Sequence, residues 1–460
     1  MVDVARLKPF RLTIVHPCVG RRIGMKRYIR TWTMEPIPAA MLAALAPREV
    51  EVRFWDDRFE PIPYDQPADL VAISVETYTA RRAYQIASEF RRRRVPVVMG
   101  GFHATLCPGE VSRHCESIVL GEAELLFPQA IDDYRHGRPQ KTYYSHDRPA
   151  LNVTPDRSIF AGKRYLPMRL VEFSRGCRFR CDFCSIQSFF QATHNHRPLD
   201  RVLDEVRRVR RPGQMIFFID DNLTSGLEQA KELMRALIPL RIRWVSQMAI
   251  HAAFDDEILD LMRRSGCQGL LIGFESLDES SLQQMNKGFN LVGGGAAPAL
   301  ANLRRHGLPV YGTFLFGYDG DTAATFAKTV EFAIGQGLFL AAFNHVTPFP
   351  GPPLYQRISA KGRMLFDAWW LDGRYRYNMV PFLPRQMSPQ ELAGQCVEAR
   401  RRFYSWNSIA RRAAKPVNHR GPFVMANFVA INAMHRWDVS GRNGLPLGDE
   451  SWTGPFIEAS

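Results

Sequence analysis

Residues 168–184 read MRLVEFSRGCRFRCDFC. The first part, Met168–Phe173, is a short apolar run typical of a buried strand, and the second part carries Cys177, Cys181 and Cys184. Three thiolates within eight residues of a loop can reach one metal centre and leave one coordination position vacant. Soft sulfur ligands favour an iron–sulfur cluster or zinc. The stretch therefore predicts a metal centre at the carboxyl end of a strand.

Strand-like runs alternating with helical patterns continue after this stretch. The further expected strands are Met215–Ile219, Arg243–Met248, Gly269–Gly273, Pro309–Phe316 and Leu338–Val346. The expected helices between them include Leu199–Val209, Leu227–Leu237 and Thr322–Gln336. Six strand–helix units predict an incomplete (βα)6 barrel, whose chemistry is expected in the loops at the carboxyl ends of the strands.

The first 150 residues predict a different α/β arrangement, an open doubly wound parallel sheet. The expected strands are Arg11–His16, Glu51–Trp55, Asp69–Val75, Pro96–Gly100 and Ser117–Leu120, with a helix over Ala80–Arg94. Ligands of such sheets bind beyond the carboxyl ends of the strands. The turns there contain neither GxGxxG nor GxxxxGK[ST], so neither a dinucleotide fingerprint nor a nucleotide P-loop is supported.

The length of 460 residues, with 46% hydrophobic and 23% charged residues, is that of a globular protein of two or three domains. We expect domains at 1–150, 151–360 and 361–460, the last a mostly helical cap that is a candidate for the substrate side. A helix is expected to begin near Ser388, where Ser-Pro-Gln-Glu reads as a capping box. Most aromatic residues of 361–460 are expected to lie in a packed core. The candidates for a substrate cavity are Trp369, Trp370, Tyr375 and Tyr377.

No run approaches the ~20 apolar residues of a membrane span, and Met1–Pro9 shows no apolar signal region, so a cytoplasmic location is expected. The net charge of +14 suits a nucleic-acid surface or arginines spread over helix faces, and the second interpretation is favoured because the arginines do not form one patch. The eight cysteines, three clustered and five scattered, indicate a metal site with buried thiols rather than a disulfide framework.

Two alternatives to an iron–sulfur cluster remain at this level. His194 and His196 could supply a fourth ligand to a closed zinc site, although structural zinc sites usually use Cys-x₂-Cys pairs and only Cys181 and Cys184 have that spacing. A chance cluster of cysteines is the other alternative.

The spacing of Cys177, Cys181 and Cys184, with Phe183 before the last cysteine and the first barrel strand before them all, resembles the radical S-adenosylmethionine (SAM) enzymes. The resemblance implies that the three thiolates hold three irons of a [4Fe–4S] cluster, while the fourth iron binds the amino and carboxylate groups of SAM.

The later strand ends extend this resemblance. Residues 217–222, FFIDDN, resemble the segment whose polar end faces the SAM amino group, and residues 348–355, PFPGPPLY, resemble the turn that closes the barrel near adenine. The residues that the resemblance assigns to SAM are Phe183, Asp220, Asp221, Ser246, Gln247, Glu275 and Pro348.

The amino-terminal sheet resembles the cobalamin-binding domain that precedes the barrel in one large branch of the radical SAM enzymes. Its glycine turns would let backbone amides approach the nucleotide tail of the corrin. The residues assigned to cobalamin are Ser74, Thr77, Tyr78, Thr79, Gly100, Gly101, His103, Thr105, Gly121 and Glu122. The Asp-x-His-x-x-Gly motif that places a histidine below cobalt is absent, so His103 is expected to contact the tail or the turn rather than the metal.

The resemblance implies a cobalamin-dependent radical SAM methyltransferase that acts on an unactivated sp³ carbon, or a phosphinate phosphorus, of a small molecule. The cofactors would be a [4Fe–4S] cluster, SAM and methylcobalamin, with flavodoxin or ferredoxin as reductant and no nucleic acid. The alternative is a radical cyclase or oxidase without net methyl transfer. An RNA methylthiotransferase is more remote, because Cys18, Cys107 and Cys115 lack the spacing of its second cluster. A pure cobalamin sensor is disfavoured by the intact cysteine trio.

Overall fold

The computed structural model describes residues 9–25, 33–439, 441 and 443–458. The chain forms two compact units. The first contains the residues up to Leu166 together with Ala368–Tyr377 and the segment from Leu445, and the second contains Pro167–Asp367 and Asn378–Gly444. Residues 1–8, where no secretory signal was expected, lie outside the described residues. No described helix is long and apolar enough to cross a membrane.

The first unit is built on a six-stranded parallel sheet with the order β3-β1-β4-β5-β6-β7. The strands are β1 Arg11–His16, β3 Glu51–Asp56, β4 Leu70–Ser74, β5 Val97–Gly100, β6 Ser117–Val119 and β7 Thr142–Tyr143. Because β3 lies on one side of β1 and the later strands on the other, the strand order reverses between β1 and β4. In doubly wound sheets this reversal marks the ligand edge.

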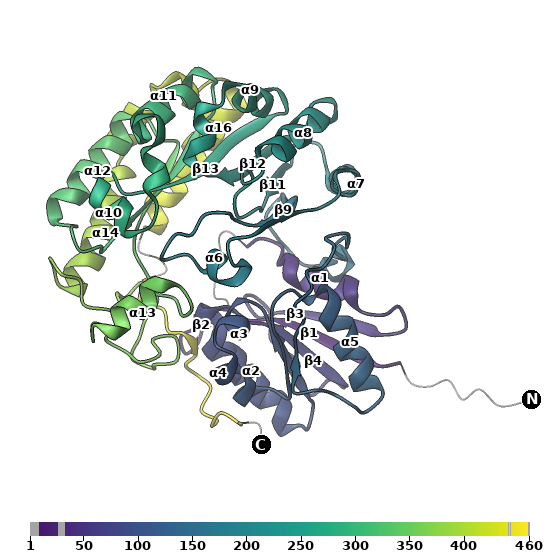
Figure 1. Cartoon of the computed structure of the whole chain (residues 1–460). Helices are drawn as coiled ribbons and strands as arrows, with labels where there is room; N and C mark the ends of the chain where they lie inside the picture. Colours follow the sequence, from purple (N-terminus) through teal and green to yellow (C-terminus); the bar gives the residue numbers. More distant parts are fainter. Residues whose placement is uncertain (1–8, 26–32, 440, 442, 459–460) are drawn as a thin grey trace, which may run out of the picture. The chain divides into compact units, whose positions relative to one another are not determined.

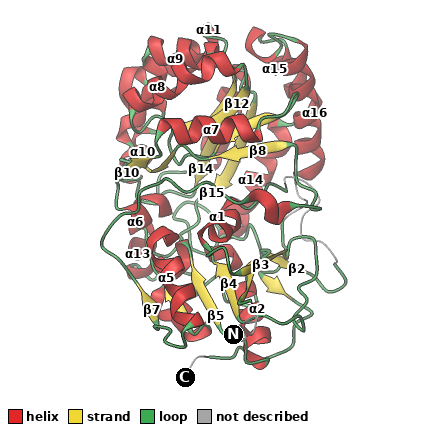
Figure 2. Ribbon diagram, turned by 90° about the vertical axis from the view of Figure 1, so that its right-hand side faces the viewer, coloured by secondary structure: helices red, strands yellow, loops and turns green. Residues whose placement is uncertain are grey.

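Helices cover both faces of this sheet (Figure 2). They are α1 Ile37–Leu45, α2 Ala80–Arg92, α3 Phe102–Leu106, α4 Pro108–Val111 and α5 Ala123–Arg135. Alternate strand residues such as Leu12 and Ile14 share a core with α1 and α5, while Val71 and Ile73 are buried outside that core. Burial on both faces explains why these strands read as continuous apolar runs.

The C-terminal part of the chain returns to the first unit. The short strand β16, Gly448–Asp449, pairs in parallel with β2, Gly20–Arg21. Gln85 of α2 bonds the backbone of Asp449 in both directions, and Trp452 donates to Glu89 at 2.8 Å. The first unit therefore includes chain from both ends of the sequence, which differs from the expected division into three consecutive domains.

The second unit is an open barrel of six parallel strands in sequential order, from β8 through β11, β12, β13 and β14 to β15. The strands are β8 Met168–Val171, β11 Met215–Phe218, β12 Arg243–Met248, β13 Cys267–Glu275, β14 Val310–Phe316 and β15 Leu340–His345. Figure 1 shows the helices on the outer side of these strands. The expected partial (βα)6 barrel is confirmed.

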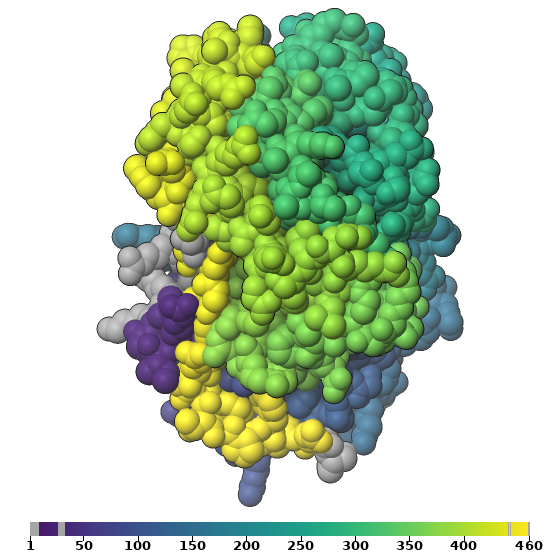
Figure 3. All heavy atoms as spheres, turned by 90° about the vertical axis from the view of Figure 1, so that its left-hand side faces the viewer, coloured from purple at the N-terminus to yellow at the C-terminus, as the bar shows by residue number. Residues whose placement is uncertain are grey.

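The helices of the second unit are α6 Ser185–Phe190, α7 Leu199–Val209, α8 Leu227–Leu237, α9 Asp256–Arg264, α10 Glu279–Gln284, α11 Ala296–Arg305, α12 Ala323–Gly335, α13 Pro353–Ala360, α14 Pro389–Phe403, α15 Trp406–Ala413 and α16 Pro422–Asp438. A capping box at Ser388 and Glu391 starts α14, as expected. Helix α12 contacts α14 and α15, and α15 contacts α16. Figure 3 shows the yellow-green atoms of this part of the chain beside the green atoms of the residues that precede it. Helices α14, α15 and α16 therefore extend the barrel unit beyond its last strand.

Candidate functional site

The loop after β8 is shaped before it reaches the first cysteine. Strand β9, Ser174–Gly176, pairs antiparallel with β10, His194–His196. Gly176 has a φ of 80°, and a side chain there would collide with the carbonyl oxygen of Thr193. A glycine is therefore required immediately before Cys177.

Two carboxylates at the end of β11 hold this loop by its backbone. Asp220 accepts hydrogen bonds from the amide of Ser174 and from its hydroxyl, the latter at 2.5 Å. Asp221 accepts from the amide of Gly176 at 2.7 Å. Burial raises the pKa of Asp220 to about 7 and that of Asp221 to about 6. Both carboxylates are thus committed to the cysteine loop, and a contact of either with SAM stays a prediction.

Asn222 connects the same strand end to the first thiol. Its side-chain amide donates to the sulfur of Cys177 at 3.6 Å, while its oxygen accepts from the amide of Ala249 and the hydroxyl of Thr224, both at 3.0 Å. Asn222 lies in the segment that the sequence analysis quoted, but it was not among the predicted site residues.

The second half of the loop is anchored through Asp182, between the other two cysteines. Its amide donates to the carbonyl of Met285 at 2.9 Å, and its carboxylate accepts from the hydroxyl of Tyr318 at 2.7 Å and pairs with Arg357 at 2.8 Å. The three partners come from separate parts of the barrel unit, so the loop is held at several points. No local pattern in the sequence indicated Tyr318 or Arg357.

The three thiols differ in burial, and two of them lie near the same cation. Cys181 is buried, and burial raises its pKa to about 12 and also raises that of Cys184, while the Lys287 ammonium opposes both shifts. Burial alone would lower the pKa of Lys287, but Glu275 and Cys181 raise it above its ordinary value. Lys287 therefore keeps its charge beside the thiols, as thiolate ligands to a metal require.

Three soft sulfur donors on one loop are ligands that suit an iron–sulfur cluster or zinc. Among the described residues, no three side chains of His, Cys, Asp or Glu converge as they would on one metal ion. A [4Fe–4S] cluster takes each thiolate at a different iron, so its ligands surround a body instead of meeting at a point. His194, on β10 opposite Gly176, has its pKa lowered to about 4 by burial and joins no such group. The three thiols on one anchored loop therefore fit the expected cluster.

The remaining predicted SAM residues lie at successive strand ends. Ser246 donates to the carbonyl of Phe218 and Gln247 to that of Asp220, both at 2.7 Å. Pro348 follows β15. The ring of Phe183 lies 5.8 Å from the Lys287 ammonium. Because Ser246 and Gln247 bond strand-end carbonyls, their direct contact with SAM stays a prediction.

Glu275 occupies a strained position at the end of β13. A β-bulge between Gly273 and Glu275 interrupts the pairing with β14, and Glu275 has a φ of 61°. Its carboxylate accepts from Lys287 at 3.0 Å, and a side chain at Gly273 would collide with it. Strain of this kind persists only where the surroundings enforce it and is frequent at functional sites.

The buried polar atoms that lack a partner among the described residues include two on these loops. They are the hydroxyl of Ser225, after β11, and the side-chain oxygen of Asn290, whose amide bonds the carbonyls of Gly273 and Phe274. An unpaired buried polar group costs about 1–3 kcal/mol, so a polar ligand at these strand ends would relieve a real penalty. This observation fits a bound SAM.

The predicted cobalamin residues gather at the carboxyl ends of β4, β5 and β6. Thr105 links two turns, since its hydroxyl donates to the carbonyl of Gly101 at 3.0 Å and accepts from the amide of Gly121 at 2.9 Å. Gly101 has a φ of 96°, and an added Cβ would lie 2.9 Å from the hydroxyl oxygen of Ser74. Gly121 has a φ of 81° with nothing within 4 Å of an added Cβ. Gly100 ends β5, and Glu122 precedes α5.

His103 is fully buried within the first unit. Its ring nitrogens bond the Thr77 hydroxyl at 3.2 Å and the Glu110 carboxylate at 3.0 Å. Trp370 also donates to Glu110, at 3.0 Å. The histidine is therefore fixed in a protein network, and its expected contact with the nucleotide tail or the turn stays a prediction.

The aromatic residues of 369–377 belong to the same unit. Tyr78 lies 5.1 Å from the rings of both Trp369 and Tyr377, and Thr79 caps the turn by accepting from the amide of Glu76 at 3.1 Å. Trp369, Trp370 and Tyr375 are buried. These three residues are core of the first unit. Tyr377, the fourth candidate for a substrate cavity, is partly exposed.

The family model described as the radical SAM superfamily matches residues 171–333, which begin at the last residue of β8 and include the cysteine loop. Bacteriochlorophyllide d C-12(1)-methyltransferase of Chlorobaculum tepidum is 30% identical over 396 residues, covering 83% of this chain and 86% of that protein. The chain belongs to the radical SAM superfamily.

Two further comparisons concern this radical SAM protein. The anaerobic magnesium-protoporphyrin IX monomethyl ester cyclase of Rubrivivax gelatinosus is 26% identical, covering 72% of this chain and 64% of that protein. The structure of the radical SAM methyltransferase TsrM from Kitasatospora setae, with cobalamin and a [4Fe–4S] cluster bound, is similar with a TM-score of 0.59 at 18% identity, covering 77% and 75%. The comparisons confirm the expected family, fold class and enzyme class. The residues that hold the cofactors stay a prediction.

Proposed function

We propose that this protein is a cobalamin-dependent radical SAM methyltransferase that methylates an unactivated sp³ carbon of a small molecule. One observation carries the proposal: a three-cysteine loop anchored at the first strand of a parallel barrel, in a chain that also folds a separate doubly wound unit with linked glycine turns. The relative from Chlorobaculum tepidum is a methyltransferase, which supports methyl transfer as the reaction.

We assign the cluster to Cys177, Cys181 and Cys184. When bound, the reduced cluster supplies the electron that cleaves SAM to a 5′-deoxyadenosyl radical, and methylcobalamin supplies the methyl group. The protein's own part is positional. Asp220 and Asp221 fix the loop backbone, Asn222 hydrogen-bonds one thiol, and Lys287 keeps positive charge beside the other two.

We assign cobalamin to the first unit, over the turns of Gly101 and Gly121. The space beside Gly121 is open, and its backbone amide is already oriented by Thr105. A turn of this kind lets a bulky ligand approach the backbone closely. The contacts of Ser74, Thr77, Tyr78 and Thr79 with the corrin belong to the same proposal.

The substrate class follows from the relative rather than from a motif. That relative is named for methylation of bacteriochlorophyllide d, so we propose a carbon substituent of a tetrapyrrole as the first substrate to test. A phosphinate phosphorus is the less favoured acceptor. The second candidate function is cyclisation or oxidation without net methyl transfer, which the cyclase relative from Rubrivivax gelatinosus favours.

The partner proposal is a small acidic electron carrier such as flavodoxin or ferredoxin, acting in the cytoplasm, with no nucleic acid. Two arginines of the run Arg91–Arg94 are paired, Arg91 with Glu116 at 2.7 Å and Arg93 with Asp65 at 2.9 Å. Paired cations on helix faces are a weaker attraction for a polyanion than a patch of unpaired ones. RNA that copurified with a steep salt dependence would contradict this part.

The test is anaerobic reconstitution with iron, sulfide and cobalamin, followed by incubation with methyl-labelled SAM, a reductant and a bacteriochlorophyllide. Label in the product together with 5′-deoxyadenosine supports methyl transfer. An oxidised or cyclised product without label, with 5′-deoxyadenosine, supports the second candidate. Stoichiometric zinc without iron, or no affinity for corrinoids, would overturn both.

A further inference from the structure

Helix α16 lies at the amino ends of the barrel strands, opposite the strand ends that carry the cysteine loop. Arg420, just before the helix, donates to the carbonyl of Cys267, the first residue of β13, at 2.7 Å. Asn432 of the helix donates to the carbonyl of Phe339, directly before β15, at 3.1 Å. Figure 2 shows α16 beside α15 at the outer edge of this unit. In barrels the amino ends of the strands carry no chemistry, so α16 is available for another role.

One stripe of α16 packs against the protein. Val424, Phe428 and Asn432 are buried at intervals of four residues, which places them on one face of a helix. The ring of Phe428 lies 5.2 Å from that of Phe339. The side-chain oxygen of Asn432 accepts a hydrogen bond from the buried Arg412 at 2.9 Å. These contacts determine which face of α16 points outward.

The outward face of α16 is apolar. Ala426, Val429, Ala430 and Trp437 are exposed, Val429 to 44% and Trp437 to 78%. The helix contains no Asp, Glu, Lys or Arg from Pro422 to His435. Helix α7 of the same unit instead exposes five charged side chains, which are Asp200, Arg201, Asp204, Arg207 and Arg208. Because a helix that is apolar on every side is normally covered on every side, the outward face of α16 is expected to have an occupant.

Tryptophan and arginine border this face at the carboxyl end of α16. Trp406, the first residue of α15, is 53% exposed, and the guanidinium of Arg436 lies 5.4 Å from its ring. Arg436 immediately precedes the exposed Trp437. Tryptophan gathers at the headgroup level of membranes, and arginine is common on helices that lie in that layer.

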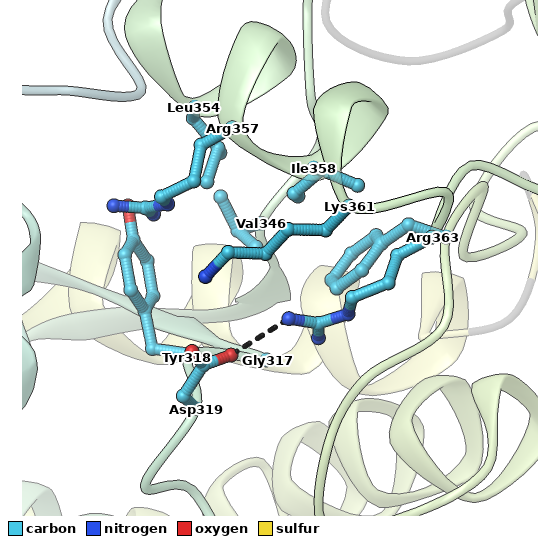
Figure 4. A pocket seen from close by; sticks show the side chains of 10 residues that line it. Gly317, Tyr318, Asp319, Val346, Leu354, Arg357, Ile358, Lys361 and Arg363 are labelled. Carbon is cyan, nitrogen blue, oxygen red and sulfur yellow. Dashed lines mark hydrogen bonds and ion pairs between the residues drawn. The ribbon is translucent and has the colours of Figure 1, made fainter.

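The chain around the face is basic. Residues 405–439 contain one carboxylate, Asp438, and five cations, which are Arg411, Arg412, Lys415, Arg420 and Arg436. Within the described part of the chain none of the five forms an ion pair with a carboxylate, and Arg412, Arg420 and Arg436 bond backbone carbonyls. Elsewhere in the unit Arg363 meets Asp319 at 2.9 Å (Figure 4). Cations without carboxylate partners beside an apolar face are complementary to anionic lipid headgroups.

The charge and the place of the face disfavour two other occupants. A second copy of this chain, related by a two-fold axis, would bring the same cations against one another. An acidic electron carrier has to approach the cluster, whose loop is at the other end of the strands. An anionic lipid surface meets neither objection.

We propose that α16, with Trp406 and Trp437, binds the surface of a membrane that contains anionic lipids. The apolar face enters the boundary between headgroups and acyl chains, and the surrounding cations contact lipid phosphates. The helix lies on the membrane, since no described helix is long and apolar enough to cross one. The inference goes beyond the proposed methyl transfer and does not depend on it.

The test is flotation of the reconstituted full-length protein with vesicles of phosphatidylglycerol and phosphatidylcholine in equal parts, and with vesicles of phosphatidylcholine alone. The protein should float with the mixed vesicles and far less with the neutral ones. Its affinity for the mixed vesicles should fall severalfold as NaCl rises from about 0.1 to about 0.5 M, because salt screens the attraction. Equal binding to the two kinds of vesicle, or binding to neither, would overturn the inference.

The double variant Val429→Gln with Trp437→Gln tests the apolar face. Its affinity for mixed vesicles should fall about tenfold or more, because it loses the burial of two apolar side chains. Leu383→Gln, at an apolar residue outside α15 and α16 that is also 44% exposed, is the matched control and should bind as the wild type does. An undiminished affinity in the double variant would contradict the assignment of α16.

Arg411→Gln with Lys415→Gln tests the charge and should weaken binding to mixed vesicles severalfold. Arg201→Gln with Arg208→Gln removes the same charge from α7 and should have little effect, and equal losses in the two pairs would refute a local role for the cations.

Light scattering without lipid identifies the competing occupant. A dimer that Val429→Gln with Trp437→Gln dissociates, together with no flotation, would assign the face to a second copy instead. SAM cleavage without vesicles should be the same in every variant, so that a loss of flotation is not a loss of fold.

Discussion

Lys287 donates a hydrogen bond to Glu275 at 3.0 Å, and both residues are buried. The pair joins the bulged end of β13 to the cation that faces Cys181 and Cys184. A buried ion pair contributes little net stability by itself, but the loss of one partner leaves a charge without compensation. This pair therefore has a structural and an electrostatic role that variants can separate.

Lys287→Met should lower the stability of the metal-free protein by about 3–5 kcal/mol, because it leaves Glu275 buried and unpaired. The double variant Glu275→Gln with Lys287→Met should recover most of that loss. Urea unfolding of the reduced, anaerobic protein measures both. Arg207→Met, which breaks an exposed pair with Asp204, is the control and should cost under about 1 kcal/mol. Equal losses of stability in Lys287→Met and Arg207→Met would contradict the role assigned to the buried pair.

Cys177→Ala, Cys181→Ala and Cys184→Ala should each abolish iron–sulfur spectra and SAM cleavage, because each removes one proposed cluster ligand. Cobalamin binding should persist, since its proposed residues lie in the first unit. Iron content, electron paramagnetic resonance and corrinoid absorbance measure these outcomes. Cys396→Ala, which removes a buried thiol of α14, is the control, and this variant should keep the iron of the cluster. SAM cleavage by any of the three loop variants would refute the cluster assignment.

Asp220→Ala tests whether this carboxylate positions the loop or contacts SAM. The hydrogen bonds to Ser174 predict a loss of iron retention, with Asp220→Asn much milder because its amide oxygen still accepts. Iron content after gel filtration and SAM affinity at full iron occupancy are measured in both variants. A variant with full iron and weak SAM binding would instead assign Asp220 to SAM, as the sequence analysis expected.

Gly121→Ala should weaken cobalamin binding by tenfold or more, because the methyl group occupies the open space proposed for the ligand. Gly137→Ala is a close match for the backbone cost: Gly137 also has a positive φ, of 68°, and nothing within 4 Å of an added Cβ. Each substitution should cost about 1 kcal/mol of stability. Titration with hydroxocobalamin measures the difference, and equal affinities in the two variants would contradict the site.

Asp321→Asn tests a pH dependence of stability. Asp321 is buried and accepts from the amides of Gly317 and Tyr318 at 2.8 and 3.0 Å, and burial raises its pKa from 3.8 to about 6. A raised carboxyl pKa means that the folded state holds the proton longer, so this contribution to stability is complete below about pH 4 and is lost as the pH rises to about 6.

The Asn side chain does not ionise, so the stability of Asp321→Asn relative to the wild type should rise by on the order of 3 kcal/mol between pH 4 and 6 and stay level above that range. Unfolding midpoints at a series of pH values measure the difference. Asp65→Asn, at a side chain that is 93% exposed, should show no such gain. A difference that does not change with pH would show that Asp321 is ionised throughout.

The sequence analysis predicted the parts of the fold that depend on local periodicity. Helices α7 and α8 have the expected bounds, because an amphipathic stripe of period 3.6 is visible within a single segment. The cysteine loop was equally visible, since its three ligands lie within eight residues. Elements of this kind carry their signal in neighbouring residues.

The undetected features depend on long-range pairing. Lys287 is an isolated lysine until the fold places it beside Glu275, and Arg357 has meaning only beside Asp182. The return of Trp370 to the first unit depends on Glu110, 260 residues earlier. Such partners meet only in the folded chain, and no spacing rule within one segment could have found them.

The pairing of β16 with β2 has a consequence for biosynthesis. A ribosome that has finished the first 166 residues has not yet made Gly448, Asp449 or the tryptophan that bonds Glu89 on α2. The barrel unit can fold before β16 and Trp452 pack against the first unit. Acquisition of the corrinoid is thus expected only after the segment with β16 and Trp452 has been made, and the protein expressed as residues 1–166 alone would leave one flank of α2 uncovered.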